Sequence, residues 1–205
     1  MEIKENDLIN SAQKGDLDSF NRLVLAYQSQ VFNVALRILG DTNAADDAAQ
    51  NAFIAAYRKI STFHGGSFRS WLLTIVTHQC YDELRARKRK PTVSLEPDLP
   101  EDEAFQDSSE WLADDKPSPE QISVTRELEK AIQHCIDKLP EDFKMIAVLV
   151  DVEGLDYKDA AQIVSIPLGT IKSRLARARQ RLRDCLHGFG ELLPEEFRHM
   201  AEETT

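Results

Sequence analysis

The sequence predicts an all-α protein made of two small helical domains joined by an acidic, proline-containing linker. Apolar residues recur at intervals of three and four toward both ends of the chain, which is the spacing of one helix face, and no alternating apolar–polar run indicates a strand. Acidic residues and prolines gather in the middle. At 205 residues, with 42% hydrophobic and 29% charged residues, the chain is long enough for two small cores.

The linker is predicted to run from residue 91 to residue 125. Ten acidic residues against the single base Lys116 give this segment a net charge of -9, nearly all of the chain's -10. Its prolines interrupt any helix and favour an extended or disordered tether: Pro91, Pro97, Pro100, Pro117 and Pro119. The flanking domains, residues 1–90 and 126–187, are then close to neutral and can carry basic patches, and residues 188–205 form a C-terminal tail.

Three helices are predicted in the first domain. The apolar stripe from Phe20 to Leu39 predicts a long helix, which Gly40 ends by adopting a left-handed conformation. A second helix is expected from about Asn43 to Ile60. A third begins near Ser67, with its buried stripe at i, i+3, i+4, i+7 and i+8: Phe68, Trp71, Leu72, Ile75 and Val76.

The opposite face of the third helix is polar and increasingly basic. It comprises Ser70, Thr74, Thr77, Tyr81, Arg85 and Lys88, with His78 beside them. One interpretation is a solvated helix face, which this pattern alone favours. The other is a track for single-stranded nucleic acid, in which aromatic side chains stack on bases and cations neutralise phosphates.

A helix, a tight turn and a helix are predicted in the second domain. Gly154 ends a helix whose apolar row is Met145, Val148, Leu149 and Val152. Asp156 is placed to cap a short helix from about Tyr157 to Val164. The sequence Ser165-Ile166-Pro167 breaks that helix, and Pro167 suits the first position of the next one.

The last helix is strongly basic, with six Lys or Arg residues between 172 and 183. An apolar back is formed by Ile171, Leu175, Ala178 and Leu182, and the front by Ser173, Ala176, Arg177 and Gln180. Cations flank both edges: Lys172, Arg179 and Arg183 on one, and Arg174 and Arg181 with Thr170 on the other. This arrangement fits the major groove of DNA. The alternative is a helix for a membrane surface or an acidic partner, but the small front residues favour DNA.

Other chemistry is not predicted. No apolar run approaches the roughly 18 residues of a membrane span and no signal peptide is evident, so a cytoplasmic location is expected. Cys80, Cys135 and Cys185 have no metal-ligand spacing, and we expect all three to be reduced and structural. The histidines form no metal site either, and no cofactor is expected. Cys80 and His78 point apart on their helix and form no nucleophile–base pair.

Four segments resemble, in order, the extracytoplasmic-function group of the bacterial sigma-70 family of RNA polymerase sigma factors: AQKGDLDSFNRLVLAYQSQVFNVALRILGD, DDAAQNAF, FRSWLLTIVTHQCYDELRARKR and LPEDFKMIAVLVDVEGLDYKDAAQIVSIPLGTIKSRLARARQRL. The resemblance implies that the first domain is sigma region 2 and the second is sigma region 4 with its helix-turn-helix. It implies a non-enzymatic transcription initiation factor that directs core RNA polymerase to promoters by recognising minus-10 and minus-35 elements. Family members are often held inactive by an anti-sigma factor, so such a partner is expected.

The resemblance also assigns residues. The matches to the helix that binds the beta-prime clamp of core polymerase are Asp46, Asp47, Gln50, Asn51 and Phe53, with Asn51 where the family usually has an acid. The minus-10 surface matches the polar face of the third helix, from Ser70 to Lys88, with His78 where the family commonly has Asn. The minus-35 readers and their neighbours match Thr170, Lys172, Ser173, Arg174 and Arg177.

A freestanding helix-turn-helix regulator of transcription is the alternative function. It would explain the basic last helix. It would not explain the polar face of the third helix or the segment DDAAQNAF.

Overall fold

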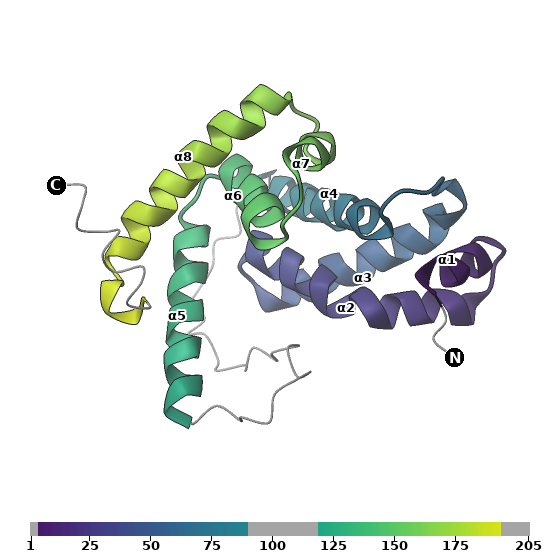
Figure 1. Ribbon diagram of the computed structural model, residues 1–205, viewed down its shortest axis with the longest axis horizontal. Helices are drawn as coiled ribbons and strands as arrows, with labels where there is room; N and C mark the ends of the chain where they lie inside the picture. The colour runs from purple at the N-terminus through teal and green to yellow at the C-terminus, as the bar shows by residue number, and fades with distance from the viewer. Residues whose placement is uncertain (1–3, 90–118, 194–205) are drawn as a thin grey trace.

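A computed structural model describes residues 4–89 and 119–193 of the protein. Residues 90–118, which include the greater part of the predicted linker, and the tail beyond residue 193 lie outside the described residues. Every element in the described ranges is helical, which confirms the all-α prediction. Helices α1 to α4 make up the first domain and helices α5 to α8 the second (Figure 1).

The first domain is built around the long helix α2. Its helices are α1 (Glu5–Gln13), α2 (Leu17–Leu39), α3 (Thr42–Lys59), which continues into the 3-10 turn η1 (Ile60–Thr62), and α4 (Phe68–Arg89). Gly40 ends α2 with φ of 68°, as its position after the apolar stripe predicts. Asp41 then caps α3 by accepting a hydrogen bond from the Ala44 N–H at 2.7 Å, so two consecutive residues turn the chain.

Small side chains set the spacing between α2 and α3. The buried face of α3 consists of alanines: Ala45, Ala48, Ala49, Ala52 and Ala56. They lie in one cluster with the branched residues Val31, Val34 and Ile38 of α2, all fully buried. Because alanine adds little bulk, the two helices can approach closely, and α4 closes the core with Leu72 and Val76.

The second domain consists of α5 (Pro119–Asp137), α6 (Glu141–Ala147) with the π-helical turn η2 (Val148–Val152), α7 (Tyr157–Ile163), α8 (Leu168–His187) and the 3-10 turn η3 (Gly190–Leu192). Helix α5 begins at Pro119, inside the segment for which the sequence predicts a linker. Gly154 has φ of 66°, and the Asp156 side chain accepts hydrogen bonds from the N–H groups of Lys158 and Asp159, both at 2.8 Å. Both predictions for this turn are therefore confirmed.

Two details of the second domain differ from the sequence prediction. Val152 is 50% exposed, although the apolar row places it with the buried Val148 and Leu149, because the π-helical turn widens the helix and rotates its last residue outward. Pro167 is the N-cap of α8 and not its first helical residue. The chain therefore enters α8 one residue later than predicted.

Cysteines 135 and 185 form a disulfide, with their Cα atoms 5.7 Å apart. The expectation that all three cysteines are reduced is wrong for this pair, because α5 and α8 pack together and bring positions 50 residues apart into bonding range. Cys80 is free and fully buried in the first domain. Burial raises the pKa of its thiol to about 12, so it stays protonated near neutral pH.

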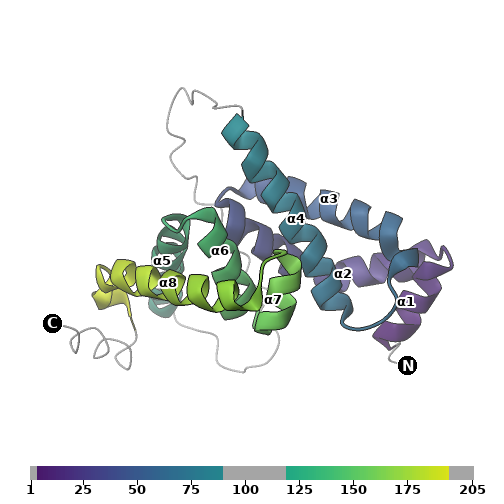
Figure 2. The same ribbon diagram turned by 90° about the horizontal axis from the view of Figure 1, so that it is seen from above.

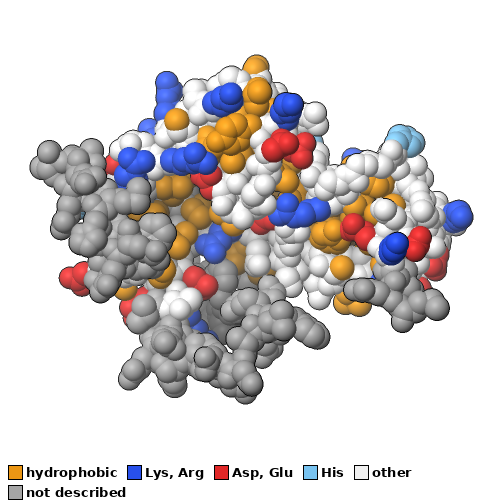
Figure 3. Space-filling model, in the orientation of Figure 1, with side chains coloured by type: hydrophobic (Ala, Val, Ile, Leu, Met, Phe, Trp, Pro, Cys, Tyr) orange, Lys and Arg blue, Asp and Glu red, His pale blue; other side chains and the backbone are white. Residues whose placement is uncertain are grey.

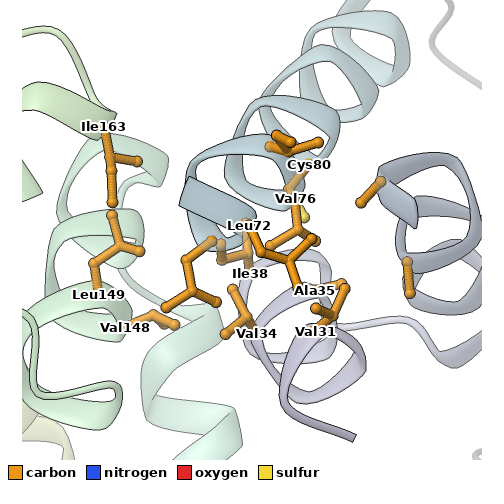
Figure 4. Packing of buried hydrophobic residues seen from close by; sticks show 14 of the residues in the cluster. Val31, Val34, Ala35, Ile38, Leu72, Val76, Cys80, Val148, Leu149 and Ile163 are labelled. Carbon is orange, nitrogen blue, oxygen red and sulfur yellow. The ribbon is translucent and has the colours of Figure 1, made fainter. Parts of the chain in front are cut away.

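The two domains pack against each other through one shared hydrophobic core. Helix α2 contacts α5, α6 and η2, and α4 contacts α7, which lies beside the N-terminal half of α4 (Figure 2). The side chain of Leu149 points toward Ile163 (Figure 4), and both residues lie in the same buried cluster as Val148 and as Val34 and Ile38 of α2. Burying such branched side chains removes apolar surface from water, so the described part of the chain forms one compact body.

Candidate nucleic-acid interface

The basic helix α8 presents its predicted front to solvent. Ile171, Leu175 and Ala178 are buried against the second domain, while Lys172, Ser173 and Arg177 are exposed. Lys and Arg side chains gather over this helix in the upper part of the space-filling view (Figure 3). The predicted apolar back of α8 is therefore buried, and its predicted front and cationic edge are exposed.

The flanking cations of α8 differ in what they contact. Arg179 makes a two-pronged ion pair with Asp151, with its Nη2 donating to Oδ1 at 2.5 Å. The guanidinium of Arg181 lies over the Phe143 ring, 5.6 Å from its centre. Both side chains thus contact their own domain, whereas the sequence places them only on the cationic edges of the helix.

Among the predicted minus-35 residues, Thr170 and Arg174 are half-buried. Thr170 accepts a hydrogen bond at its carbonyl from Ser173 Oγ at 3.1 Å, and Arg174 pairs with Asp142 at 2.9 Å. Lys172 and Arg177 make no ion pair with any residue that the structure describes. The front of α8 therefore offers Arg177 and the Ser173 hydroxyl, and its edge offers Lys172, for contacts to base edges and phosphates.

Helix α3 presents its predicted polymerase-binding residues outward. Asp46, Asp47, Gln50 and Asn51 are exposed, and Phe53 is half-buried against the core. One turn further along, Ile54 and Tyr57 are also exposed, at 50% and 40%. These two apolar residues are absent from the predicted binding residues, although their position outside the buried alanine face of α3 indicates an exposed apolar surface.

The residues predicted to contact the minus-10 element lie along α4 as expected; we call Ser70, Thr74, Thr77, His78, Tyr81, Arg85 and Lys88 the α4 face. Their surroundings differ from the prediction of an open face. Ser70, Thr74 and Tyr81 are half-buried and Thr77 is only 1% exposed. The C-terminal end of the α4 face is open, where the Arg85 guanidinium lies 4.8 Å from the centre of the Tyr81 ring.

The second domain covers much of the α4 face. Ser70 Oγ donates to Asp159 of α7 at 3.4 Å, and His78 Nε2 lies 3.1 Å from the carbonyl oxygen of Ile163. Lys88 pairs with Glu141 of α6 at 2.7 Å. All three partners belong to the second domain, so no pattern in the sequence of the first domain could identify them.

Two clefts flank the contact between α4 and α7. One of about 360 Å³ is lined by Ser70, Trp71 and Thr74 with Asp159 and Gln162. The other, of about 370 Å³, is lined by Thr77, His78 and Tyr81 together with residues of α6, α7 and α8. The Thr77 hydroxyl is buried and has no hydrogen-bond partner among the residues that the structure describes, so one polar group of the α4 face is unsatisfied.

None of the described helices is both long and apolar enough to cross a membrane. Within the same part of the chain, no cluster of His, Cys, Asp or Glu could hold a metal ion.

Comparison with known proteins identifies both domains. The family model described as Sigma-70 region 2 matches residues 23–90, and the one described as Sigma-70, region 4 matches residues 129–182. The RNA polymerase sigma-H factor of Pseudomonas aeruginosa is 35% identical over 184 residues, which cover 89% of this chain and 94% of that protein. The ECF RNA polymerase sigma factor SigW of Bacillus subtilis is also 35% identical, covering 89% and 97%.

Two solved structures share the fold. The sigma factor RpoE of Bartonella quintana, in complex with the anti-sigma factor NepR, has a TM-score of 0.62 at 24% identity and covers 83% of this chain and 98% of its own. CnrH in complex with the cytosolic domain of CnrY has a TM-score of 0.62 at 20% identity, covering 88% and 96%. Together with the relatives and the two matched regions, these findings show that the chain belongs to the extracytoplasmic-function group of the sigma-70 family of RNA polymerase sigma factors.

Proposed function

We propose that this sigma factor binds core RNA polymerase and directs it to promoters through a division of labour among three helices. Helix α3 binds the beta-prime clamp through Asp46, Asp47, Gln50, Asn51 and Phe53. The α4 face recognises the minus-10 element and holds its strand open. Helix α8 reads the minus-35 element. No covalent chemistry is required, because binding energy spent on the unpaired strand is sufficient to open promoter DNA.

The observation that carries the proposal is the front of α8. Lys172 and Arg177 are exposed cations on the second helix of a helix-turn-helix, without ion-pair partners among the described residues. A long donor beside small residues such as Ser173 and Ala176 can reach a guanine edge in the major groove, while a flanking Lys contacts phosphate. The membrane alternative is disfavoured, because this front offers no bulky apolar side chain to a bilayer.

The exposed surface of α3 supports binding to core polymerase. It joins the acidic pair Asp46 and Asp47 to the apolar residues Ile54 and Tyr57. A surface with an apolar centre and a charged rim is typical of protein interfaces. A freestanding regulator of transcription would have no use for it.

An anti-sigma factor is a further proposed partner. The two solved structures that share this fold are complexes, one with the anti-sigma factor NepR and the other with the cytosolic domain of CnrY. We also propose that the protein acts in the cytoplasm, where core polymerase and DNA are found.

Run-off transcription with purified core polymerase on a pool of genomic fragments tests the proposal. Specific transcripts should require both the sigma factor and the core enzyme, and the protein alone should bind the selected promoters weakly. Tight, specific binding to duplex DNA without core polymerase would support the freestanding regulator instead.

A matched pair of variants tests base readout by α8. Arg177→Ala should weaken promoter binding by about 1 to 3 kcal/mol if the side chain contacts a base edge. Arg181→Ala removes the same charge from the same helix, but the Arg181 side chain lies over Phe143 and not on the front of α8. Because it then contributes positive charge and no base contact, its loss should lower binding to native and scrambled minus-35 DNA alike. Equal losses on both DNAs for both variants would argue against base readout by Arg177.

A further inference from the structure

The basic helix α8 is partly neutralised by acidic residues of its own domain. The carboxylates of Asp142 and Asp151 pair with two of its arginines. We propose that these two acidic residues, which we call the counter-ions, keep their arginines from DNA phosphates and so limit the affinity of sigma region 4 for DNA of any sequence. The inference rests on the proposed function of α8 and deepens it, because the counter-ions are positioning residues that act through the arginines.

The counter-ions lie at opposite ends of the helix that packs behind α8. Asp142 is in the first turn of α6, and Asp151 is in η2, which continues α6. Helix α6 contacts α8 (Figure 2), and Ala147 of α6 shares a buried cluster with Ala178 of α8. The paired arginines belong to the two opposite cationic edges of α8, so each edge has one acidic partner from the same helix.

The pair of Arg179 with Asp151 is the more closely held. The Arg179 Nε donates to both carboxylate oxygens, at 3.2 and 3.1 Å, and its Nη2 donates to Oδ1 at 2.5 Å. Such a fork fixes the orientation of the guanidinium as well as its position. The Arg179 side chain is 49% exposed, so DNA could approach it, but its charge is already neutralised.

The pair of Arg174 with Asp142 places the acid on the solvent side. Arg174 Nη1 lies 2.9 Å from Asp142 Oδ2, and the two side chains are 31% and 50% exposed, respectively. The carboxylate is therefore more exposed than the guanidinium that it neutralises. A phosphate that approaches Arg174 also meets the negative charge of Asp142, which reduces the attraction.

Counter-ion release explains why these pairs limit DNA binding. A protein cation that neutralises a phosphate releases a condensed ion such as Na⁺ from DNA, and this release drives binding. If Arg174 leaves Asp142 for a phosphate, the freed carboxylate attracts a cation from solution, so no ion is released on balance. Lys172 and Arg177 are exposed and have no ion-pair partner among the described residues. Their phosphate contacts would therefore give the full release, which those of the paired arginines do not.

Stability and DNA binding should respond differently to loss of a counter-ion. Exposed ion pairs stabilise a fold only weakly. In contrast, each additional phosphate contact steepens the dependence of log K on log salt concentration by about 0.9. Removal of a counter-ion should therefore leave the thermal midpoint nearly unchanged and alter the salt dependence of DNA binding.

Asp142→Asn and Asp151→Asn in the full-length protein test the proposal. Each substitution keeps the shape of the side chain and removes its charge. Fluorescence anisotropy measures binding to a promoter duplex selected by run-off transcription and to the same duplex with a scrambled minus-35 element, over a series of salt concentrations. Each variant should bind both duplexes roughly five- to tenfold more tightly at about 100 mM salt, with a salt slope steeper by about 0.9.

Two controls separate a freed arginine from a general change of charge. Asp184 is exposed on α8, accepts a hydrogen bond from Gln180 at 2.8 Å and pairs with no cation that the structure describes. Asp184→Asn therefore removes one negative charge from the same helix and should leave the salt slope unchanged. In an Arg174→Ala background, Asp142→Asn should gain nothing, because the arginine that it would free is absent.

The outcomes separate the counter-ions from the proposed function of α8. An equal gain from Asp184→Asn, or a gain that persists in the Arg174→Ala background, would assign the effect to overall charge and overturn the proposal. Weaker binding with a lowered thermal midpoint would also overturn it, because the pairs would then only stabilise the domain. Unchanged salt slopes would overturn the counter-ions alone if Arg177→Ala still loses specificity. If Arg177→Ala also leaves binding to both duplexes unchanged, the proposed function of α8 is wrong.

Discussion

The disulfide between Cys135 and Cys185 is expected to contribute a calculable free energy to the stability of region 4. It closes a loop of 50 residues that contains α6, α7 and most of α8. In the chain-entropy description, a cross-link over a loop of this length stabilises the folded state by about 4 kcal/mol, because it restricts the unfolded chain. We therefore expect reduction to lower the stability of region 4 by up to about that amount.

Reduction should weaken region 4 without unfolding it at room temperature. Apolar packing that needs no disulfide also holds this region together: Leu139, just after α5, lies in one buried cluster with Ala178 of α8. The rings of His134 and Phe189 meet edge to face at 5.8 Å. For a chain of this size, a loss of about 4 kcal/mol corresponds to a fall in the thermal midpoint of roughly 8 to 16 °C.

The assay is thermal unfolding, followed by circular dichroism, with and without a phosphine reductant. Mass spectrometry under non-reducing conditions establishes the cross-link before each measurement. The Cys135→Ser/Cys185→Ser double variant is the control: it should melt near the reduced parent and should not respond to reductant. Cys80 should not interfere, because its buried thiol has a pKa raised to about 12 and little reactive thiolate forms.

Two results would refute this reasoning. Three free thiols in protein purified without reductant would show that the cross-link does not form. A verified disulfide whose reduction leaves the midpoint unchanged would show that it does not restrict the unfolded chain in the way assumed.

The remaining predictions concern α3 and α7. Gln50→Ala should weaken binding to core polymerase while changing stability by less than about 0.5 kcal/mol, because the residue is exposed; undiminished binding in a pull-down would place the interface elsewhere. Asp156→Ala should cost about 1 kcal/mol, since two N–H groups at the start of α7 lose their acceptor. Asp184→Ala is the control: it removes the same charge at an exposed site late in α8 and should leave the urea midpoint nearly unchanged. Equal shifts of the midpoint in the Asp156 and Asp184 variants would argue against capping of α7 by Asp156.

Local chemistry made much of this protein predictable from its sequence. Gly40 and Gly154 end helices because the left-handed backbone there favours glycine, and Asp156 caps α7 because its carboxylate reaches N–H groups two and three residues ahead. The buried and exposed sides of α8 follow from helical periodicity over a few turns. Each of these features depends on residues close in sequence, so a pattern in the chain is sufficient to reveal it.

Contacts between distant segments could not be read in the same way. A polar stripe such as the α4 face has the same spacing whether it meets water, DNA or another domain, and the packing of α7 onto it depends on shape and apolar area across more than eighty positions. The pairing of Cys135 with Cys185, the π-helical turn that exposes Val152 and the ion pair of Arg69 with Glu153 likewise arise when helices meet in space. Periodicity reports which side of a helix is apolar, whereas the identity of the surface that covers each side depends on how the whole chain packs.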